Sequence, residues 1–310
     1  MRLWVLAVLI FVAHAGACGQ AASPLVYTWK AGDLFRFDYQ KTICVVQPDE
    51  TGAREERRTE VAAVLILEIK TVSPAGAGGT LRFDSPRLTL PAMRLFPGAE
   101  DEIKPLPDKN RAVARTIEGA LKTASWTVLL SPSGAITVES RKPASYNEWI
   151  KDLSNAGGWR KRLNETVARL VEQDLGLKAQ TVDRELLLCT DPAEASSAPG
   201  QALHPLRAGF AFSSKTGKTN ASFERRLPAA SATGYAVPAL AGPTTVHIQP
   251  QKLKMHESKA VFDSALGMLD SLIEDYEVKL DYEYRGQHLD QEVRVQYKLK
   301  RLAPPIVKAD

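Results

Sequence analysis

Strict alternation of apolar and polar residues near the end of the chain constrains the fold more than any other sequence feature. Between residues 276 and 284, Tyr, Val and Leu occupy every second position, with Glu, Lys and Asp between them. Residues 293–300 alternate in the same way. Because successive side chains of a strand point to opposite faces, the pattern predicts two strands, each with one apolar and one charged face.

These two strands are predicted to pair as a hairpin. The residues between them, Arg285–Asp290, contain Gly286 and supply the turn. The charged face of the first strand is mainly acidic and that of the second is mainly basic. Cross-strand ion pairs would therefore favour the pairing by about 0.2–1 kcal/mol each.

The same alternation recurs in the first third of the chain, beginning with Phe35, Phe37 and Tyr39. It predicts an antiparallel meander with these parts: a strand over 35–40, a polar loop over 47–56, a strand over 60–72, a break at Gly78-Gly79 and a strand over 80–90.

Further strands follow a Pro-rich, charged excursion over residues 91–110. Ser131–Gly134 has Pro at the second turn position and Gly where positive φ is needed, which predicts a tight hairpin turn. Pro250 indicates an edge or a bulge in its strand. The strands predicted in this part are 126–130, 135–140, 207–213, 222–227 and 244–255.

The period of the pattern changes in the middle of the chain. Ser145 precedes Glu148 by three residues, a capping-box pattern that predicts a helix start. Apolar residues then recur every three or four positions over 163–175. We predict a helical insertion over about 145–188 and a Pro-, Ala- and Ser-rich loop over 191–205. The predicted class is α+β, a mainly antiparallel curved sheet (an open half-barrel or meander) with a mid-chain helical segment.

The first seventeen residues have the layout of a secretory signal peptide. Arg2 gives a positive start, residues 3–13 are an unbroken apolar run, and Ala15-Gly16-Ala17 is a small-residue cleavage site. The apolar run spans about half of a ~30 Å bilayer as a helix, too short for a lasting anchor. We expect residues 1–17 to be removed and residues 18–310 to form a single β-rich domain exported to the periplasm or cell envelope.

Cys18 directly follows this cleavage site and leaves two alternatives open. In the first, ordinary cleavage after Ala17 makes Cys18 a reactive terminal thiol. In the second, Ala15-Gly16-Ala17-Cys18 resembles a lipobox, and an acylated Cys18 tethers the protein to a membrane. The lipobox pattern prefers Leu at the position that Ala15 holds here.

Cys44 and Cys189 are the remaining cysteines, and so the one pair available for a disulfide within the exported chain. An oxidising compartment permits the bond, which needs the two Cα atoms within about 4.4–6.8 Å of each other. The alternative is two buried, inert thiols. The sequence leaves both open.

The sequence carries no signature of a catalytic, metal or nucleotide site. Lys215–Thr219 resembles the end of a phosphate-binding loop, but Phe212 stands where that loop needs glycine, so we expect a polar hairpin turn. The histidines lack zinc-site spacing, and no serine lies in a Gly-x-Ser-x-Gly motif. With a net charge of +4 and its basic residues dispersed, the chain shows no nucleic-acid-binding face. We predict no catalytic residue, metal, cofactor or nucleic-acid partner.

Short motifs near both ends carry a family resemblance. Trp29-Lys30-Ala31-Gly32-Asp33 opens the first strand, and Val261-Phe262-Asp263 and Gly267-Met268-Leu269 precede the last two. In this layout the chain resembles a family of exported bacterial proteins of unknown function, which begin with a Trp-x-x-Gly strand, carry mid-chain helices and end in a β-meander. The architecture is also similar to the curved sheets of LolA-like lipoprotein and lipid carriers, an analogy of fold alone.

These observations favour a non-enzymatic envelope protein that binds a hydrophobic ligand such as a lipid, or another envelope component. The candidate ligand-lining residues are inward aromatic residues of the predicted strands: Phe35, Phe37, Tyr282, Tyr284 and Tyr297. Alternating aromatics are also what an ordinary sheet core shows. Two alternatives remain, an exported hydrolase with a dispersed active site and a purely structural envelope module.

Overall fold

The structure is a computed structural model that describes residues 25–48, 52–90, 109–142, 186–190, 206–215, 217–226, 235–238, 245–284 and 287–303. Its elements are β1 (Leu34–Pro48), β2 (Arg54–Ser73), β3 (Gly76–Thr89), α3 (Lys109–Thr123), β4 (Ser125–Leu130), β5 (Ile136–Lys142), β6 (Leu206–Lys215), β7 (Lys218–Arg226), β8 (Tyr235–Pro238), β9 (Thr245–Asp263), β10 (Met268–Tyr284) and β11 (Gln287–Arg301).

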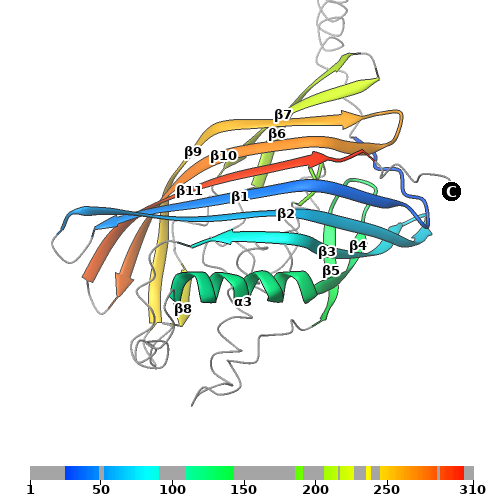
Figure 1. The fold of residues 1–310 in the computed structure, drawn as a ribbon. Helices are drawn as coiled ribbons and strands as arrows, with labels where there is room; N and C mark the ends of the chain where they lie inside the picture. The colour runs from blue at the N-terminus through cyan, green and yellow to red at the C-terminus, as the bar shows by residue number, and fades with distance from the viewer. Residues whose placement is uncertain are drawn as a thin grey trace, which may run out of the picture.

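The strands form one open, antiparallel and strongly curved sheet, and α3 lies on its concave side (Figure 1). The strand order is β5-β4-β3-β2-β1-β11-β10-β9-β7-β6, with β8 paired to β9. β1 pairs with both β2 and β11, so the first and last strands of the sequence meet inside the sheet. Two meanders, β1–β3 and β9–β11, are thereby joined into one curved surface.

The predicted curved antiparallel sheet is confirmed, but the class α+β fits weakly. α3 is the single helix of the described residues. The predicted insertion over 145–188 lies outside them except for Leu186–Leu188, which are buried and not helical. The carbonyl groups of Leu186 and Leu188 instead accept hydrogen bonds from the hydroxyls of Tyr297 and Tyr27. The predicted loop over 191–205 is also outside the described residues.

Helix α3 was not predicted, although its sequence carries a helical signal. Val113, Ile117 and Leu121 recur every four residues, and all three are buried. Glu118 Oε1 accepts a hydrogen bond of 2.7 Å from the backbone N–H of Leu88, which holds the helix against the end of β3. No helix among the described residues is both long and apolar enough to cross a bilayer.

β1 and β2 run further than predicted, and the predicted polar loop over 47–56 is wrong at both ends. β1 continues to Pro48 and β2 begins at Arg54, in register with each other. Charged residues extend these strands because they find partners on both faces of the sheet. Arg57 pairs with Glu55 at 2.8 Å on the face that Val45 shares, and the alternate residues lie on the outer face. Arg54, for example, donates a 3.0 Å hydrogen bond to Glu292 of β11.

Gly78 and Gly79 lie inside β3 and do not break it, contrary to the prediction. Gly79 pairs with Ile69, next to an irregularity in the register of β2 and β3. A Cβ atom at Gly79 would lie 2.5 Å from the carbonyl oxygen of Glu68. Glycine is therefore used here for a close approach of two strands, and the turn lies at residues 74–75.

Other predicted turns are confirmed. Gly134 and Gly217, in the β4–β5 and β6–β7 connections, both have positive φ. A shift in the pairing of β9 with β10 occurs where Leu280 pairs with Pro250, as expected for a bulge. The last turn is shorter than predicted, because residues 287–290 already belong to β11 and only 285–286 separate it from β10.

Residues 25–30, which we call the strap, cross one end of the sheet ahead of β1. The backbone N–H of Tyr27 donates to Pro132 O in the β4–β5 turn, and that of Thr28 donates to Gly267 O in the β9–β10 turn, both at 2.8 Å. These turns belong to opposite arms of the curved sheet. We call this the strap end, and the end with the β1–β2 and β10–β11 connections the hairpin end (Figure 1).

Aromatic packing fixes the strap in place. The ring of Tyr27 stacks on that of Trp29 at 5.3 Å and meets Phe262 edge-on at 5.1 Å. The hydroxyl of Tyr27 donates to Leu188 O at 3.0 Å, and Trp29 Nε1 donates to Ser131 O at 3.4 Å. The strap thus joins both arms of the sheet and the buried segment 186–190.

Candidate functional site

The inward-facing side chains of the sheet form two separate apolar clusters. The strap-end cluster combines sheet residues with side chains from the strap, from α3 and from Leu186–Leu188. The hairpin-end cluster, within the described residues, consists of side chains from β1, β9, β10 and β11 alone. Its members are Tyr276, Val278, Leu280, Val293 and Val295, with Ile43, Val45, Leu253 and Met255 packed against them.

A polar row lies at the boundary between these clusters, and one of its members, Tyr297, also belongs to the strap-end cluster. Lys41 of β1 is in register with Tyr297 of β11, which is in register with Glu274 of β10. On each strand the row falls between inward residues of the two clusters, such as Leu272 and Tyr276 on either side of Glu274. Two strand spacings place the Cα atoms of Lys41 and Glu274 about 10 Å apart.

Both charged residues of the row are buried. Lys41 is 3% exposed and Glu274 is 1% exposed, and each interacts with other groups of the protein. Taking an ammonium or a carboxylate out of water is costly and has to be offset by such interactions. Buried ionisable groups that lie between two apolar clusters are therefore candidates for a functional role.

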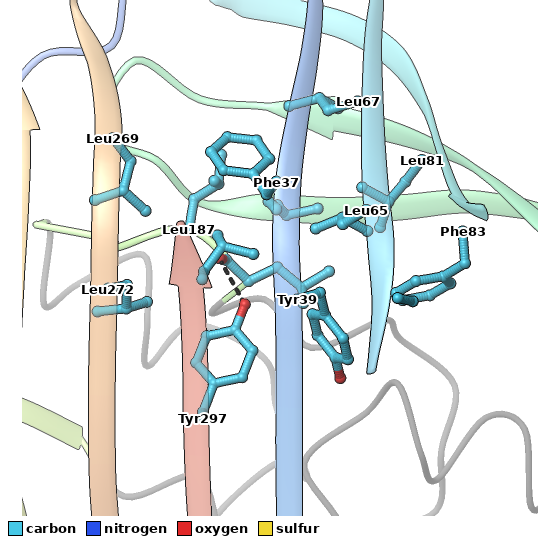
Figure 2. Packing of buried hydrophobic residues seen from close by; sticks show 14 of the residues in the cluster. Phe37, Tyr39, Leu65, Leu67, Leu81, Phe83, Leu187, Leu269, Leu272 and Tyr297 are labelled. Carbon is cyan, nitrogen blue, oxygen red and sulfur yellow. Dashed lines mark hydrogen bonds between the residues drawn. The ribbon is translucent and has the colours of Figure 1, made fainter. Parts of the chain in front are cut away.

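Three of the five aromatic residues predicted to line a ligand site, Phe35, Phe37 and Tyr297, lie on this face, where the protein's own chain packs around them. Phe37 is fully buried, and Phe35 is partly buried with its ring 6.3 Å from that of Trp29. Figure 2 shows Leu187 beside Phe37 and Tyr297, and the hydroxyl of Tyr297 donates to Leu186 O at 3.1 Å. These three residues are core at the strap-end cluster.

Tyr282 and Tyr284, the other two candidates, belong to β10 near the hairpin end. Their backbones pair with Leu289 and Gln287 of β11, and their side chains are outside the described part of the chain. The structure therefore brings Phe35, Phe37 and Tyr297 together and places the two β10 tyrosines at the far end of the sheet.

The opposite, outer face carries a polar hollow of about 270 Å³ near the hairpin end. Strand register puts its residues on one face of β2, β1, β11 and β10. Its lining consists of Thr42, Cys44, Val46, Glu56, Arg58, Glu277, Glu292, Arg294 and Gln296. Cys44 pairs with Arg58 on one side and with Arg294 on the other.

The charged groups of this hollow are tied to one another. Arg294 donates two hydrogen bonds to Asp275, at 2.9 and 2.7 Å, and this guanidinium holds the pKa of the Asp275 carboxyl below its usual range. Glu292 accepts from Lys279 at 2.7 Å and from Arg54 at 3.0 Å, and the two cations lower its pKa. The predicted cross-strand ion pairs of the last hairpin are therefore present.

Cys44 is held as a thiol in this hollow. Burial raises its pKa, and the adjacent Glu56 carboxyl raises it further, against the opposing effect of Arg58 and Arg294. Because the thiolate is the reactive form, a raised pKa is the opposite of what a cysteine nucleophile needs.

Cys44 and Cys189 are both thiols, so the disulfide left open by the sequence does not form in this structure. They occupy opposite ends of the sheet. Cys44 is half-buried near the hairpin end, whereas Cys189 is buried at the strap end, beside Thr190, whose N–H donates to Ser133 O at 3.0 Å. Cys18 lies outside the described residues.

Two histidines, His256 and His288, have described side chains, and both pair with carboxylates of the sheet. His288 Nδ1 lies 3.2 Å from Asp281, and His256 Nε2 lies 3.6 Å from Glu277. In the described part of the chain, no group of three or more His, Cys, Asp or Glu side chains is placed to hold a metal ion.

Sequence reasoning missed the polar row, although a signal for it exists. Lys41 continues the inward series of Phe37 and Tyr39, and Glu274 precedes Tyr276 in the inward series of β10. Both Lys41 and Glu274 are charged residues at positions where the alternation of their strand calls for an apolar residue. A scan of protein-family models and a search of curated protein sequences found no match to this chain.

Proposed function

We propose that this chain is an exported, non-enzymatic binding module of the bacterial cell envelope, whose ligand is an amphiphile taken up on the concave face of the sheet. The resemblance to exported bacterial proteins and the signal-peptide layout of residues 1–17 support the location. The acylated form of Cys18 would tether the module to a membrane.

The polar row is the observation that carries this proposal. Lys41 and Glu274 lie buried between two apolar clusters on one continuous face. An apolar chain seated on one cluster would place a polar head group at the row, beside the ammonium of Lys41 and the carboxylate of Glu274. Pockets for such ligands are mostly apolar with a few convergent polar groups, which matches this composition.

Substitutions that remove charge from the row test the proposal. We expect Lys41→Met and Glu274→Gln to weaken binding of a fluorescent fatty acid or lysophospholipid by about tenfold, because each removes a charged hydrogen-bonding group at constant size. Lys298→Met is the matched control, since Lys298 neighbours Tyr297 but is exposed on the opposite face. The affinity is measured by fluorescence titration.

Two outcomes would contradict the proposal. If the wild-type chain binds no amphiphile, the charged residues of the row serve only to stabilise the fold, and the protein is a structural module. If the control and the row variants lose affinity equally, the ligand does not contact the row.

A further inference from the structure

Exposed large apolar side chains gather at the strap end of the molecule. Each is between 45% and 58% exposed, and together we call them the apolar rim: Val26, Leu34, Val72, Leu129 and Leu266. In the described part of the chain, the one other large apolar side chain of comparable exposure is Leu289, at 47%, near the hairpin end. Scattered exposed apolar residues need no explanation, whereas several at one end of a molecule make that end a candidate interaction surface.

The rim is held together by the strap and the turns that it joins. Val26 belongs to the strap, next to the Tyr27 N–H that donates to Pro132 O. Leu266 precedes Gly267, whose carbonyl oxygen accepts from Thr28. Val72 is the second-last residue of β2, just before the turn at residues 74–75. The backbone contacts of Tyr27 and Gly267 therefore fix the positions of Val26 and Leu266 within the rim.

Leu34 and Leu129 extend the rim onto the flanks of the same end. Leu34 is the first residue of β1, directly after the strap, and Leu129 is the second-last residue of β4, beside the turn that the strap contacts. The rim therefore includes residues from both arms of the curved sheet.

Exposed cations accompany the rim. Lys30 in the strap, Lys70 near the end of β2 and Lys215 at the end of β6 are all exposed. At this end the carboxylates of Asp263 and Asp270 are already bound by Arg301, at 3.0 and 3.1 Å. Lysines beside apolar side chains complement the anionic head groups of a membrane surface, each contributing about 1 kcal/mol near an anionic leaflet.

The position of Cys18 favours the same partner. The chain from Cys18 to Leu25 spans at most about 25 Å when fully extended. An acyl group on Cys18 would therefore hold the strap end within that distance of the bilayer, and would hold the hairpin end further away. A single acyl chain binds membranes only marginally, so a second contact is needed for stable attachment.

We infer that the apolar rim is a membrane-contact surface, on which the protein sits with its strap end against an anionic lipid bilayer. The inference rests on the proposed envelope location and does not depend on the amphiphile-binding role of the concave face. On this inference the strap has two roles. It joins the two arms of the sheet, and it faces the membrane, because few residues separate it from Cys18.

Hydrogen exchange on a vesicle-tethered chain tests this surface directly. The mature chain, beginning at Cys18 and carrying Cys44→Ser, is coupled through Cys18 to a maleimide lipid in phosphatidylethanolamine–phosphatidylglycerol vesicles. The reference is the same protein capped with a small maleimide. We expect amide exchange in the strap and in the β9–β10 turn to slow by about tenfold on the vesicles. Exchange near Leu289 should not change.

Variants decide whether the rim causes the protection. Val26→Glu with Leu266→Glu should abolish it, whereas Leu289→Glu, matched in exposure at the other end, should retain it. No protection at the strap end, or equal protection at both ends, overturns the inference. Protection in the capped protein that grows with its concentration would overturn it in favour of a second copy of the chain.

The natural tether is checked separately, by the mass of the mature N-terminus after expression in a bacterial host. An acyl mass on Cys18 supports the proposed location. A bare Cys18 would contradict the tether, while the vesicle experiment would still decide whether the rim contacts lipid. If the wild-type chain binds no amphiphile in the fluorescence titration, the proposed function is contradicted. The vesicle-protection result and the N-terminal mass are independent of that outcome.

Discussion

Gly134 and Gly267 allow the strap to meet the two arms of the sheet. Gly134 has φ of +97° and Gly267 has φ of +57°. A Cβ atom at Gly134 would lie 2.4 Å from Tyr27 Cε2 and 2.5 Å from Leu188 O, and one at Gly267 would lie 2.3 Å from Thr28 Oγ1. The two turns therefore combine a left-handed backbone with a close approach that no side chain fits.

Gly134→Ala is expected to destabilise the fold by about 2–4 kcal/mol, because it adds a clash to the strain of positive φ. Gly217→Ala is the matched control, since Gly217 also has positive φ (+74°) but a Cβ there meets nothing within 4 Å. Its cost should be about 1 kcal/mol. Urea unfolding of both variants measures the difference, and equal costs would show that the strap does not pack against this turn.

Asp275→Asn is expected to remove about 1 kcal/mol of stability at pH 7, since the charge-assisted pair with Arg294 is partly exposed. The pKa of Asp275 is lowered in the folded state by Arg294. Its contribution is therefore complete above the unfolded pKa of about 3.9 and is lost as the pH falls through the folded pKa. Urea unfolding at pH 7 and at about pH 2 should show the two proteins converging in acid. If the two unfolding free energies still differ at about pH 2, the stabilisation does not come from the ionised Asp275 carboxylate.

At the scale of elements, the strap, α3 and Leu186–Leu188 are the parts that turn a curved sheet into a closed core at one end. The strap is linked to Leu188 by the Tyr27 hydroxyl, and β11 is linked to Leu186 by the Tyr297 hydroxyl. Both acceptors are main-chain carbonyls of a buried, irregular segment, which needs such partners because it forms no helix or ladder.

Tyr27→Phe removes one of these links and is expected to lower the free energy of unfolding by about 1–2 kcal/mol, because the buried Leu188 carbonyl loses its donor while the ring packing is kept. Lys30→Met, an exposed change in the same strap, should have little effect. Thermal unfolding compares the two. A neutral Tyr27→Phe would show that another donor replaces the hydroxyl.

Local patterns predicted the strands better than the contacts between them. The alternation over residues 276–284 and 293–300 predicted the second half of β10 and the second half of β11, and Pro and Gly predicted the turn at Ser131–Gly134, because strand faces and turn angles depend on neighbouring residues. The strap contact of Tyr27 with Leu188 joins residues 161 positions apart, and no local pattern encodes such a pairing.

The same limit explains the errors. The Gly78-Gly79 pair resembles a break in the sequence, and only the approach of Glu68 from the neighbouring strand shows why glycine is needed inside β3. The polar residues of 47–56 resemble a loop until β11 supplies Glu292 as a partner for Arg54. Each prediction failed because a tertiary contact outweighs the local preference of the residues.

At the scale of the whole molecule, the two faces and two ends of the sheet differ in chemistry. The outer face near the hairpin end carries a network of ion pairs around Cys44, whereas the concave face carries two apolar clusters with the buried row of Lys41, Tyr297 and Glu274 at their boundary. The strap end adds an exposed apolar rim. The binding module that we propose, with one end on a membrane and an amphiphile on its concave side, accounts for the last two of these features.

Native mass spectrometry of the full chain, purified from the envelope of a bacterial host under non-denaturing conditions, shows whether an amphiphile is bound. We expect a non-covalent adduct of one amphiphile per chain, which organic extraction removes and which Lys41→Met depletes relative to Lys298→Met. A spectrum that shows the bare chain alone, with nothing recovered by extraction, would contradict the proposed function.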